Sequence, residues 1–387
     1  MYDFDRIINR RGTDCVKYDN IPTSGRPLDT IPLFVADMDF AVVPEIKAAL
    51  QKVVDRDIYG YPIRGKEYFE SMASWYSRRY GWAIQEEWLL TTPGVVHALN
   101  LAVRAYTNKG DYVLLLTPVY GPFGAAVKAQ DRIIADCPLH YENNRYTVDF
   151  DAFEKTIVEK KVKLFLLCSP HNPIGRVWTK EELTRMGNIC LAHGVTVVAD
   201  EIHSDFIFPG HKHTNFANIC PEFAANSITC TAPSKTFNLA GLWNSNILIP
   251  NAELREKFNA QMLYCHTPLP TIFAFEACKA AYDFGEAWLE ELLVYLKGNM
   301  DWVKDFCAKN LPKAEFVETE GTYLMWVDFS AYGTPEELEK KFFDGGIWMN
   351  RDADFNASPA GFYRINVASP RAIIVEAMER MSDILNG

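Results

Sequence analysis

The chain has 387 residues, of which 48% are hydrophobic, 13% aromatic and 23% charged, a composition typical of a globular protein with a substantial core. Its formal net charge of -11 argues against nucleic acid or an anionic membrane as the main partner, because both favour basic patches. No apolar stretch approaches the length of a membrane span, so we expect no membrane association.

The nine cysteines are scattered along the chain, odd in number and without a C-x-x-C pair. Several lie in apolar segments, as Cys168 does in LFLLCSP, which favours buried reduced thiols in a cytoplasmic protein. The start, MYDFDRIINRRG, lacks the apolar core of a signal peptide. His211 and His213 form a close pair, but no cysteine or carboxylate stands at a suitable spacing, so we expect no metal site.

Between residues 85 and 250, apolar runs of strand length alternate with helical patterns, which predicts an α/β protein with a largely parallel sheet. The predicted strands cover residues 88–92, 111–116, 162–168, 195–199 and 227–231. The stretch after the first strand carries apolar residues at 95, 98, 99, 102 and 106, which lie on one face of a helix.

The C-terminal third has a different pattern. Residues 286–311 predict a long amphipathic helix that Pro312 ends. Residues 322–329 and 361–368 resemble strands, and a last helix is predicted to open with Ser369 as its cap and Pro370 at its first position. We expect a large α/β domain at 46–285 and a smaller α+β domain at 286–387. The N-terminal segment, 1–45, is expected to join the smaller domain.

Polar residues follow the predicted strands at the ends where an open α/β sheet binds its ligands. They are Tyr120, Asn172, Asp200 and Lys235, and the turn at Gly94 adds backbone N–H groups at a helix start, which suit a phosphate. Each residue alone has an ordinary explanation, such as a helix cap, a turn or packing. Their order and common location at strand ends favour a shared site.

This set of groups matches the needs of pyridoxal 5'-phosphate. The lysine would form a Schiff base, the carboxylate would keep the pyridine nitrogen protonated, and the ring would thereby become an electron sink. The aromatic ring would stack on the cofactor and the amide would contact its hydroxyl. Burying Lys235 as an ammonium would be costly, whereas an imine removes that cost.

Several motifs make the chain resemble the fold-type I enzymes that use this cofactor, the aspartate aminotransferase superfamily. They are SPHNPIG (169–175), ADEIHSD (199–205), SKTFNLAGL (234–242), TPVYGPF (117–123) and GTYLMW (321–326). The stretches RRGTDCVKYD and PLFVADMDF, with DEIH, resemble its MalY/PatB branch, the cystathionine β-lyase-type C–S lyases. The resemblance covers essentially the whole chain. It implies a mostly parallel seven-stranded sheet sandwiched by helices, plus a smaller α+β domain.

The resemblance implies a role for each matching residue. Lys235 would be the Schiff-base lysine, Asp200 the partner of the pyridine nitrogen, Tyr120 the stacking ring and Asn172 the contact to O3′. The implied phosphate contacts are Ser234, Thr231 and the backbone of Gly94, Val95 and Val96. Arg364 would bind the substrate α-carboxylate as a planar bidentate donor, and Ala36, Asn172 and Tyr120 would also touch the substrate. Tyr61 would reach the phosphate of a neighbouring subunit, which implies a homodimer with shared sites.

Three positions depart from many aminotransferases of this fold. Trp243 stands where they carry an arginine near the phosphate, and His203 where they usually carry a tyrosine. Both changes are consistent with the C–S lyase branch. For His203 two interpretations stay open, a polar contact beside the cofactor or a packed core histidine. Residues 350–355, NRDADF, replace a Pro-Gly turn that relatives often have.

The resemblance implies α,β-elimination of L-cystathionine or a related cysteine S-conjugate to pyruvate, ammonia and a thiol, which is homocysteine for cystathionine. An aminotransferase with a keto-acid acceptor is the nearest alternative, and a regulatory protein that binds a partner on the same fold is another. The sequence leaves the choice among cystathionine, cystine and other S-conjugates open.

Overall fold

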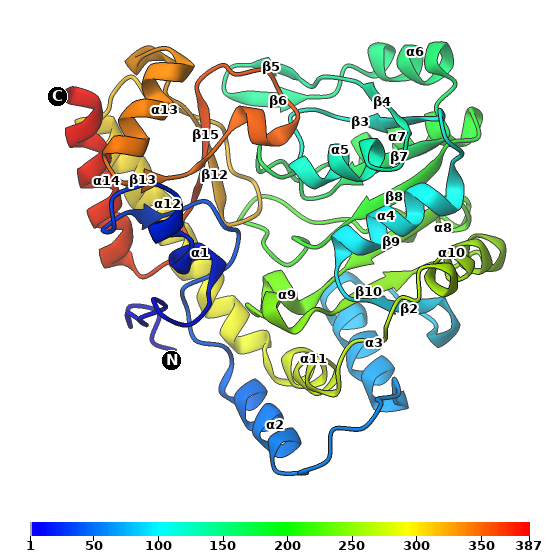
Figure 1. The fold of residues 1–387 in the computed structure, drawn as a ribbon. Coiled ribbons are helices and arrows are strands. Elements are labelled where there is room, and N and C mark those ends of the chain that lie inside the picture. Colours follow the sequence, from blue (N-terminus) through cyan, green and yellow to red (C-terminus); the bar gives the residue numbers. More distant parts are fainter. Residues whose placement is uncertain (1) are drawn as a thin grey trace.

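The computed structural model describes residues 2–387 and contains two principal sheets with helices around them (Figure 1). The order of the main sheet is β2 (Leu89–Thr92), β10 (Ser245–Leu248), β9 (Ser227–Thr231), β8 (Thr196–Asp200), β7 (Leu164–Cys168), β3 (Tyr112–Leu115) and β4 (Ile133–Asp136). All pairs are parallel except those of β10, which runs antiparallel to both neighbours. The predicted fold class, a mostly parallel seven-stranded sheet, is therefore confirmed.

Helices cover both faces of this sheet. Successive side chains of a strand point to opposite faces, and the strands carry apolar side chains on both faces, so both must be buried. Val113 and Leu115 pack with helices α4 (Val95–Tyr106), α5 (Gly121–Lys128) and α10 (Ala252–Tyr264). Leu114 packs on the opposite face, with α6 (Phe150–Lys160) and α7 (Lys180–Ala192). Asp149 caps α6, and a capping box of Thr179 and Glu182 starts α7.

The second sheet is antiparallel and lies beside the long helix α12 (Glu286–Asn310). Its order is β11 (Glu315–Phe316), β12 (Leu324–Asp328), β15 (Phe362–Asn366) and β14 (Asn350–Arg351). Helices α13 (Pro335–Asp344) and α14 (Arg371–Asn386) complete this part, and α12 packs on α14. The N-terminal segment joins it through β1 (Ile31–Pro32), which pairs with β13 (Ile347–Trp348).

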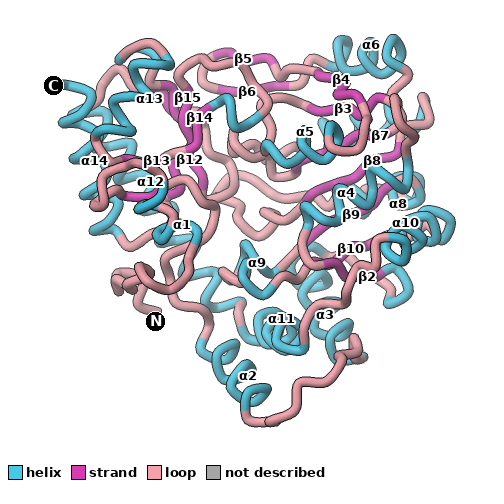
Figure 2. Tube along the Cα trace, in the orientation of Figure 1, coloured by secondary structure: helices cyan, strands magenta, loops and turns pink. Residues whose placement is uncertain are grey.

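Further helices and strands complete the fold. They are α1 (Val16–Asp19), α2 (Pro44–Val54), α3 (Lys66–Tyr80), α8 (Pro221–Ala225), α9 (Pro233–Thr236), α11 (Ile272–Phe284), β5 (His140–Glu142) and β6 (Arg145–Thr147). Irregular segments, rather than helices or strands, fill the space between the two sheets (Figure 2). Within residues 2–387, no helix combines the length and apolar character that crossing a bilayer requires.

One predicted cap is wrong. Pro370, with extended backbone angles, is the residue that precedes α14, and Ser369 lies outside the helix start. The Ser369 hydroxyl instead donates a hydrogen bond to Asp39 Oδ2 at 2.5 Å. The local sequence pattern could not show this, because the competing acceptor lies 330 residues away in the chain.

Candidate active site

A cavity of about 560 Å³ opens at the carboxyl ends of the main-sheet strands. Tyr120, Asn172, Asp200, Lys235 and the Gly94 turn all line it, so the structure brings together the five features that the sequence singled out. The volume lies in the usual range for a small-molecule site. The topology explains the convergence, because β2, β3, β7, β8 and β9 all run parallel and end at the same edge.

Asp200 is the last residue of β8 and is buried. Its Oδ1 accepts a hydrogen bond from the backbone N–H of Ile202 at 3.1 Å. Burial raises the pKa of this carboxyl to about 7, and the cation of Lys235 acts in the opposite direction. Such a carboxyl is stabilised as an anion when a protonated heterocyclic nitrogen lies beside it.

Lys235 stands on the short helix α9, directly after β9. Its Nζ donates a hydrogen bond to the carbonyl oxygen of Ala36 at 2.6 Å. Burial, and then the charge of Arg364, lower the pKa of Lys235 to about 8. Near neutral pH this amine can therefore release and take up a proton, as a general base requires.

One backbone hydrogen bond joins Tyr120 and Asn172. The N–H of Tyr120, the residue before α5, donates to the carbonyl of Asn172 at 3.0 Å. Asn172 lies in the turn after β7, where both Ser169–Pro170 and Asn172–Pro173 are cis. Burial raises the pKa of Tyr120, so its hydroxyl keeps its proton.

Arg364 connects the small sheet to this site. It lies on β15, is 3% exposed, and donates to Asn172 Oδ1 at 3.0 Å, Phe34 O at 2.5 Å and Asn350 Oδ1 at 2.7 Å. Burial lowers its pKa to about 10, so it remains a cation. Arg364 lies behind Asn172 and is not part of the cavity lining.

The predicted phosphate contacts divide into two groups. Gly94, Val95, Val96 and Ser234 line the cavity, and no side chain caps the start of α4, so its first N–H groups are available. Thr231 lies outside the lining, and its hydroxyl accepts a hydrogen bond from Tyr76 at 2.6 Å. Tyr61 is fully exposed on the surface, away from this cavity, whereas Ala36 lines it.

His203 satisfies parts of both interpretations. It is buried and its ring centroid lies 5.9 Å from that of Tyr323, yet it also lines the cavity. Burial, with the charges of Lys235 and Arg364, lowers the pKa of His203 well below its usual value, so the ring is neutral.

Three polar residues that the sequence reasoning missed also line the cavity. His97 and Asn100 follow Gly94 on α4, where helical spacing could have placed them on the cavity side. Asn244 donates to the Tyr68 hydroxyl at 2.9 Å, a contact across 176 residues that no local pattern announces. Trp243 also lines the cavity, and its φ of 52° is rare for a bulky side chain.

The residues present fit pyridoxal phosphate. The site offers an amine, a carboxyl, an aromatic ring, an amide and an uncapped helix start around one cavity. Two buried polar atoms of lining residues, Nδ1 of His203 and Oδ1 of Asn244, have no hydrogen-bond partner among the described residues. Unpartnered buried polar atoms are costly, and a bound cofactor or substrate is the natural source of partners.

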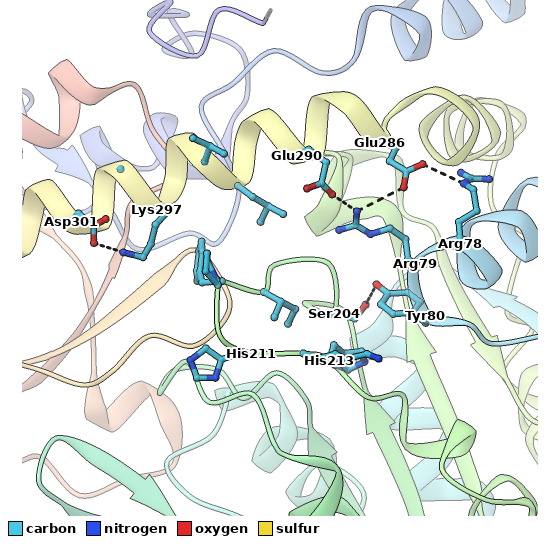
Figure 3. A pocket seen from close by; sticks show the side chains of 17 residues that line it. Arg78, Arg79, Tyr80, Ser204, His211, His213, Glu286, Glu290, Lys297 and Asp301 are labelled. Carbon is cyan, nitrogen blue, oxygen red and sulfur yellow. Dashed lines mark hydrogen bonds and ion pairs between the residues drawn. The ribbon is translucent and has the colours of Figure 1, made fainter.

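A larger cavity of about 820 Å³ lies between the end of α3 and helix α12 (Figure 3). Most of its charged side chains pair with one another, as Arg79 does with Glu290 and Lys297 with Asp301. None of the strand-end residues lines it. Because most charges of the larger cavity are already paired and Lys235 and Asp200 do not line it, the smaller cavity is the better candidate site.

Comparisons with known proteins show the family of the chain. The family model for aminotransferase class I and II matches residues 29–381. The cystathionine β-lyase PatB of Bacillus subtilis is 39% identical over 386 residues, which cover 99% of this chain and 100% of PatB.

Two solved structures are similar over the full chain. A PLP-bound putative aminotransferase from Clostridium difficile has a TM-score of 0.97 and 40% identity, and covers 100% of both chains. Cystalysin from Treponema denticola, which contains pyridoxal 5'-phosphate, has a TM-score of 0.96 and 38% identity, with 100% of this chain and 99% of cystalysin covered.

Proposed function

The chain belongs to the aminotransferase class I and II family, and we propose that it is a pyridoxal-phosphate-dependent carbon–sulfur β-lyase. The observation that carries the proposal is Lys235, an amine with a pKa of about 8 that shares a cavity with Asp200, Asn172 and Tyr120. The substrate would be L-cystathionine or a related cysteine S-conjugate. The similarity to PatB along nearly the whole chain supports the lyase over other reactions of the family.

Bound pyridoxal phosphate would supply the electron sink that makes the substrate Cα proton acidic. Lys235 would take that proton on Nζ, and the carbonyl of Ala36, now 2.6 Å away, would accept a hydrogen bond from the resulting ammonium. Asp200 would hold a proton on the pyridine nitrogen, because a buried carboxylate is stabilised by an adjacent cation. The Cβ–S bond then breaks, and the thiolate leaves with the bonding electron pair.

One residue would orient the substrate and another the cofactor. Arg364 would bind the α-carboxylate through its unpartnered Nε, while its other nitrogen atoms stay on Asn172, Phe34 and Asn350. Tyr120 would stack on the cofactor ring. Hydrolysis of the remaining three-carbon fragment gives pyruvate and ammonia.

A homodimer is part of the proposal. Ile58, Tyr59, Tyr61 and Ile63 are exposed on one segment, and Leu263, Tyr264 and Leu269 on another. The ring of Tyr59 lies 5.7 Å from that of Phe273, at the start of α11, which places the first segment beside that helix. So many exposed apolar side chains favour burial against a second copy, which would bring Tyr61 to the phosphate of the neighbouring site.

We also infer a cytoplasmic location, because all nine cysteines are free.

The test compares turnover with and without an acceptor. Purified protein with added pyridoxal phosphate should release pyruvate from L-cystathionine at the same rate with or without 2-oxoglutarate. An aminotransferase would depend on 2-oxoglutarate and would form glutamate, which would overturn the proposal.

A further inference from the structure

The charged residues of two N-terminal motifs have no role in the chemistry described so far, although they meet in the structure. Arg10 and Lys17 come from the first, RRGTDCVKYD, and Asp37 and Asp39 from the second, PLFVADMDF. Arg10 pairs with Asp37 at 2.6 Å and with Asp39 at 2.7 Å, and Lys17 pairs with Asp39 at 2.7 Å. Lys17 is completely buried and Asp39 is 3% exposed.

Asp39 accepts hydrogen bonds from four groups. Besides Arg10 and Lys17, the hydroxyls of Tyr18 and Ser369 donate to its Oδ2, at 3.1 Å and 2.5 Å. Burial of such charges is costly, and a buried ion pair often stabilises a protein no more than apolar residues of the same volume would. The arrangement is therefore better explained by what it holds in place than by the stability it provides.

The segment that these residues hold, 34–38, lies outside the helices and strands and presents its backbone carbonyls to functional side chains. The carbonyl of Phe34 accepts from Arg364 at 2.5 Å. The carbonyl of Ala36 accepts from Lys235 at 2.6 Å and from the Tyr323 hydroxyl at 2.8 Å. Backbone hydrogen bonds hold the flanking residues, Leu33 on Trp348 and Asp39 on Ala368. Between them no strand partner fixes the backbone, so side-chain contacts determine where the carbonyls of residues 34–38 lie.

Those contacts come from both sheets. On the small-sheet side, Asn366 donates to the carbonyls of Val35 and Asp37, each at 2.7 Å. On the large-sheet side, Asn238 donates to the carbonyl of Met38 at 2.9 Å. The charged cluster adds the connection to the N-terminal motif and, through Ser369, to the start of α14.

We propose that Arg10, Lys17, Asp37 and Asp39 form an N-terminal clamp that holds the carbonyl of Ala36 against the amine of Lys235. The clamp residues are positioning residues, which act on proton transfer through the Ala36 carbonyl. The clamp rests on the proposed function in one respect: the step that it serves is the transfer of the substrate Cα proton to Lys235. A fixed acceptor favours the ammonium form of Lys235 at the moment it has taken the proton.

The charged groups that face Lys235 define the direction of the expected change. Arg364 lowers its pKa, Asp37 and Asp200 raise it, and the ring of His203 beside it is neutral. Loosening the clamp would move the Ala36 carbonyl and the carboxylate of Asp37 away, so the pKa of Lys235 should fall. Deleting a distant positive charge alone would raise that pKa, so the sign separates positioning from a plain charge effect.

The test uses Lys17→Met, a substitution of similar shape that leaves Asp39 paired with Arg10, and the milder, charge-conserving Ser369→Ala. Val303→Ala, at a fully buried position of α12, is the matched control for loss of stability. In cofactor-free protein, the pH dependence of Lys235 modification by an amine reagent, read by peptide mass spectrometry, gives its pKa.

Both Lys17→Met and Ser369→Ala, which removes a donor to Asp39, should make Lys235 react faster than in the wild type at about pH 7, and Lys17→Met should lower kcat for L-cystathionine by about tenfold. Val303→Ala should change neither. Unchanged reactivity of Lys235 in folded Lys17→Met and Ser369→Ala proteins would overturn the clamp, as would an equal change in Val303→Ala. A shifted reactivity in a protein that never forms pyruvate would keep the clamp and reject the lyase.

Discussion

Lys235 should destabilise the cofactor-free protein, because the fold holds its amine in surroundings that disfavour the ammonium form. The pKa falls from 10.5 to about 8, and since each tenfold change in proton affinity is worth about 1.4 kcal/mol, the penalty is about 3 kcal/mol. The side chain borders the cavity, so solvent reduces this figure and it is an upper bound. Lys235→Met should therefore raise the free energy of unfolding at about pH 7.

The pH dependence gives the sharper form of this prediction. Because the folded-state pKa of Lys235 is depressed, the unfolded chain binds more protons between pH 8 and 10.5. The penalty is therefore complete below pH 8 and disappears as the pH rises toward 10.5. Urea unfolding of cofactor-free wild type and Lys235→Met, at about pH 7 and about pH 10, should show a difference that shrinks at the higher pH.

The exposed Lys212 provides the control, because Lys212→Met should leave stability nearly unchanged at both pH values. The reasoning would be refuted if Lys235→Met were no more stable than wild type at about pH 7. A gain that stayed constant up to about pH 10 would also refute it, because apolar packing, and not the amine, would then be the cause.

Three further predictions concern the proposed chemistry. Asp200→Asn should lower kcat by about 100-fold or more, since it removes a buried charge that acts on the reacting system, and steady-state pyruvate formation checks this. Arg364→Lys should raise KM for L-cystathionine by at least about 30-fold, because the single nitrogen of a lysine cannot keep the arginine's other hydrogen bonds while it binds the carboxylate, and an unchanged KM would contradict this. Mixing inactive Tyr61→Ala and Lys235→Ala subunits should recover activity if each site uses residues of both subunits, whereas mixtures without activity would argue against a shared site.

The sequence was sufficient to predict those helices and strands whose apolar residues are regularly spaced. The strand before Asp200 and the helix after Gly94 were predicted from apolar spacing, and both are present as β8 and α4. Parallel strands end at one edge, so the convergence of Lys235 and Asp200 followed from topology without any knowledge of side-chain contacts.

The features that the sequence did not predict depend on contacts between distant segments. The hydrogen bond from Lys235 to Ala36 joins residues 199 positions apart, through an irregular segment with no periodicity. The same reason explains the wrong cap, because Ser369 has a cap-like local sequence but donates to Asp39 instead. β10 was also not predicted, since its four residues, SNIL, are too short and mixed to give a period.

The central claim is β-elimination at the cavity that contains Lys235. The most direct test incubates purified protein and Lys235→Ala with L-cystathionine and pyridoxal phosphate, without a keto acid, and measures pyruvate and free thiol together. The account predicts equal amounts of pyruvate and thiol from the wild type and neither from Lys235→Ala. No pyruvate from wild-type protein that carries its cofactor, or equal turnover by Lys235→Ala, would contradict it.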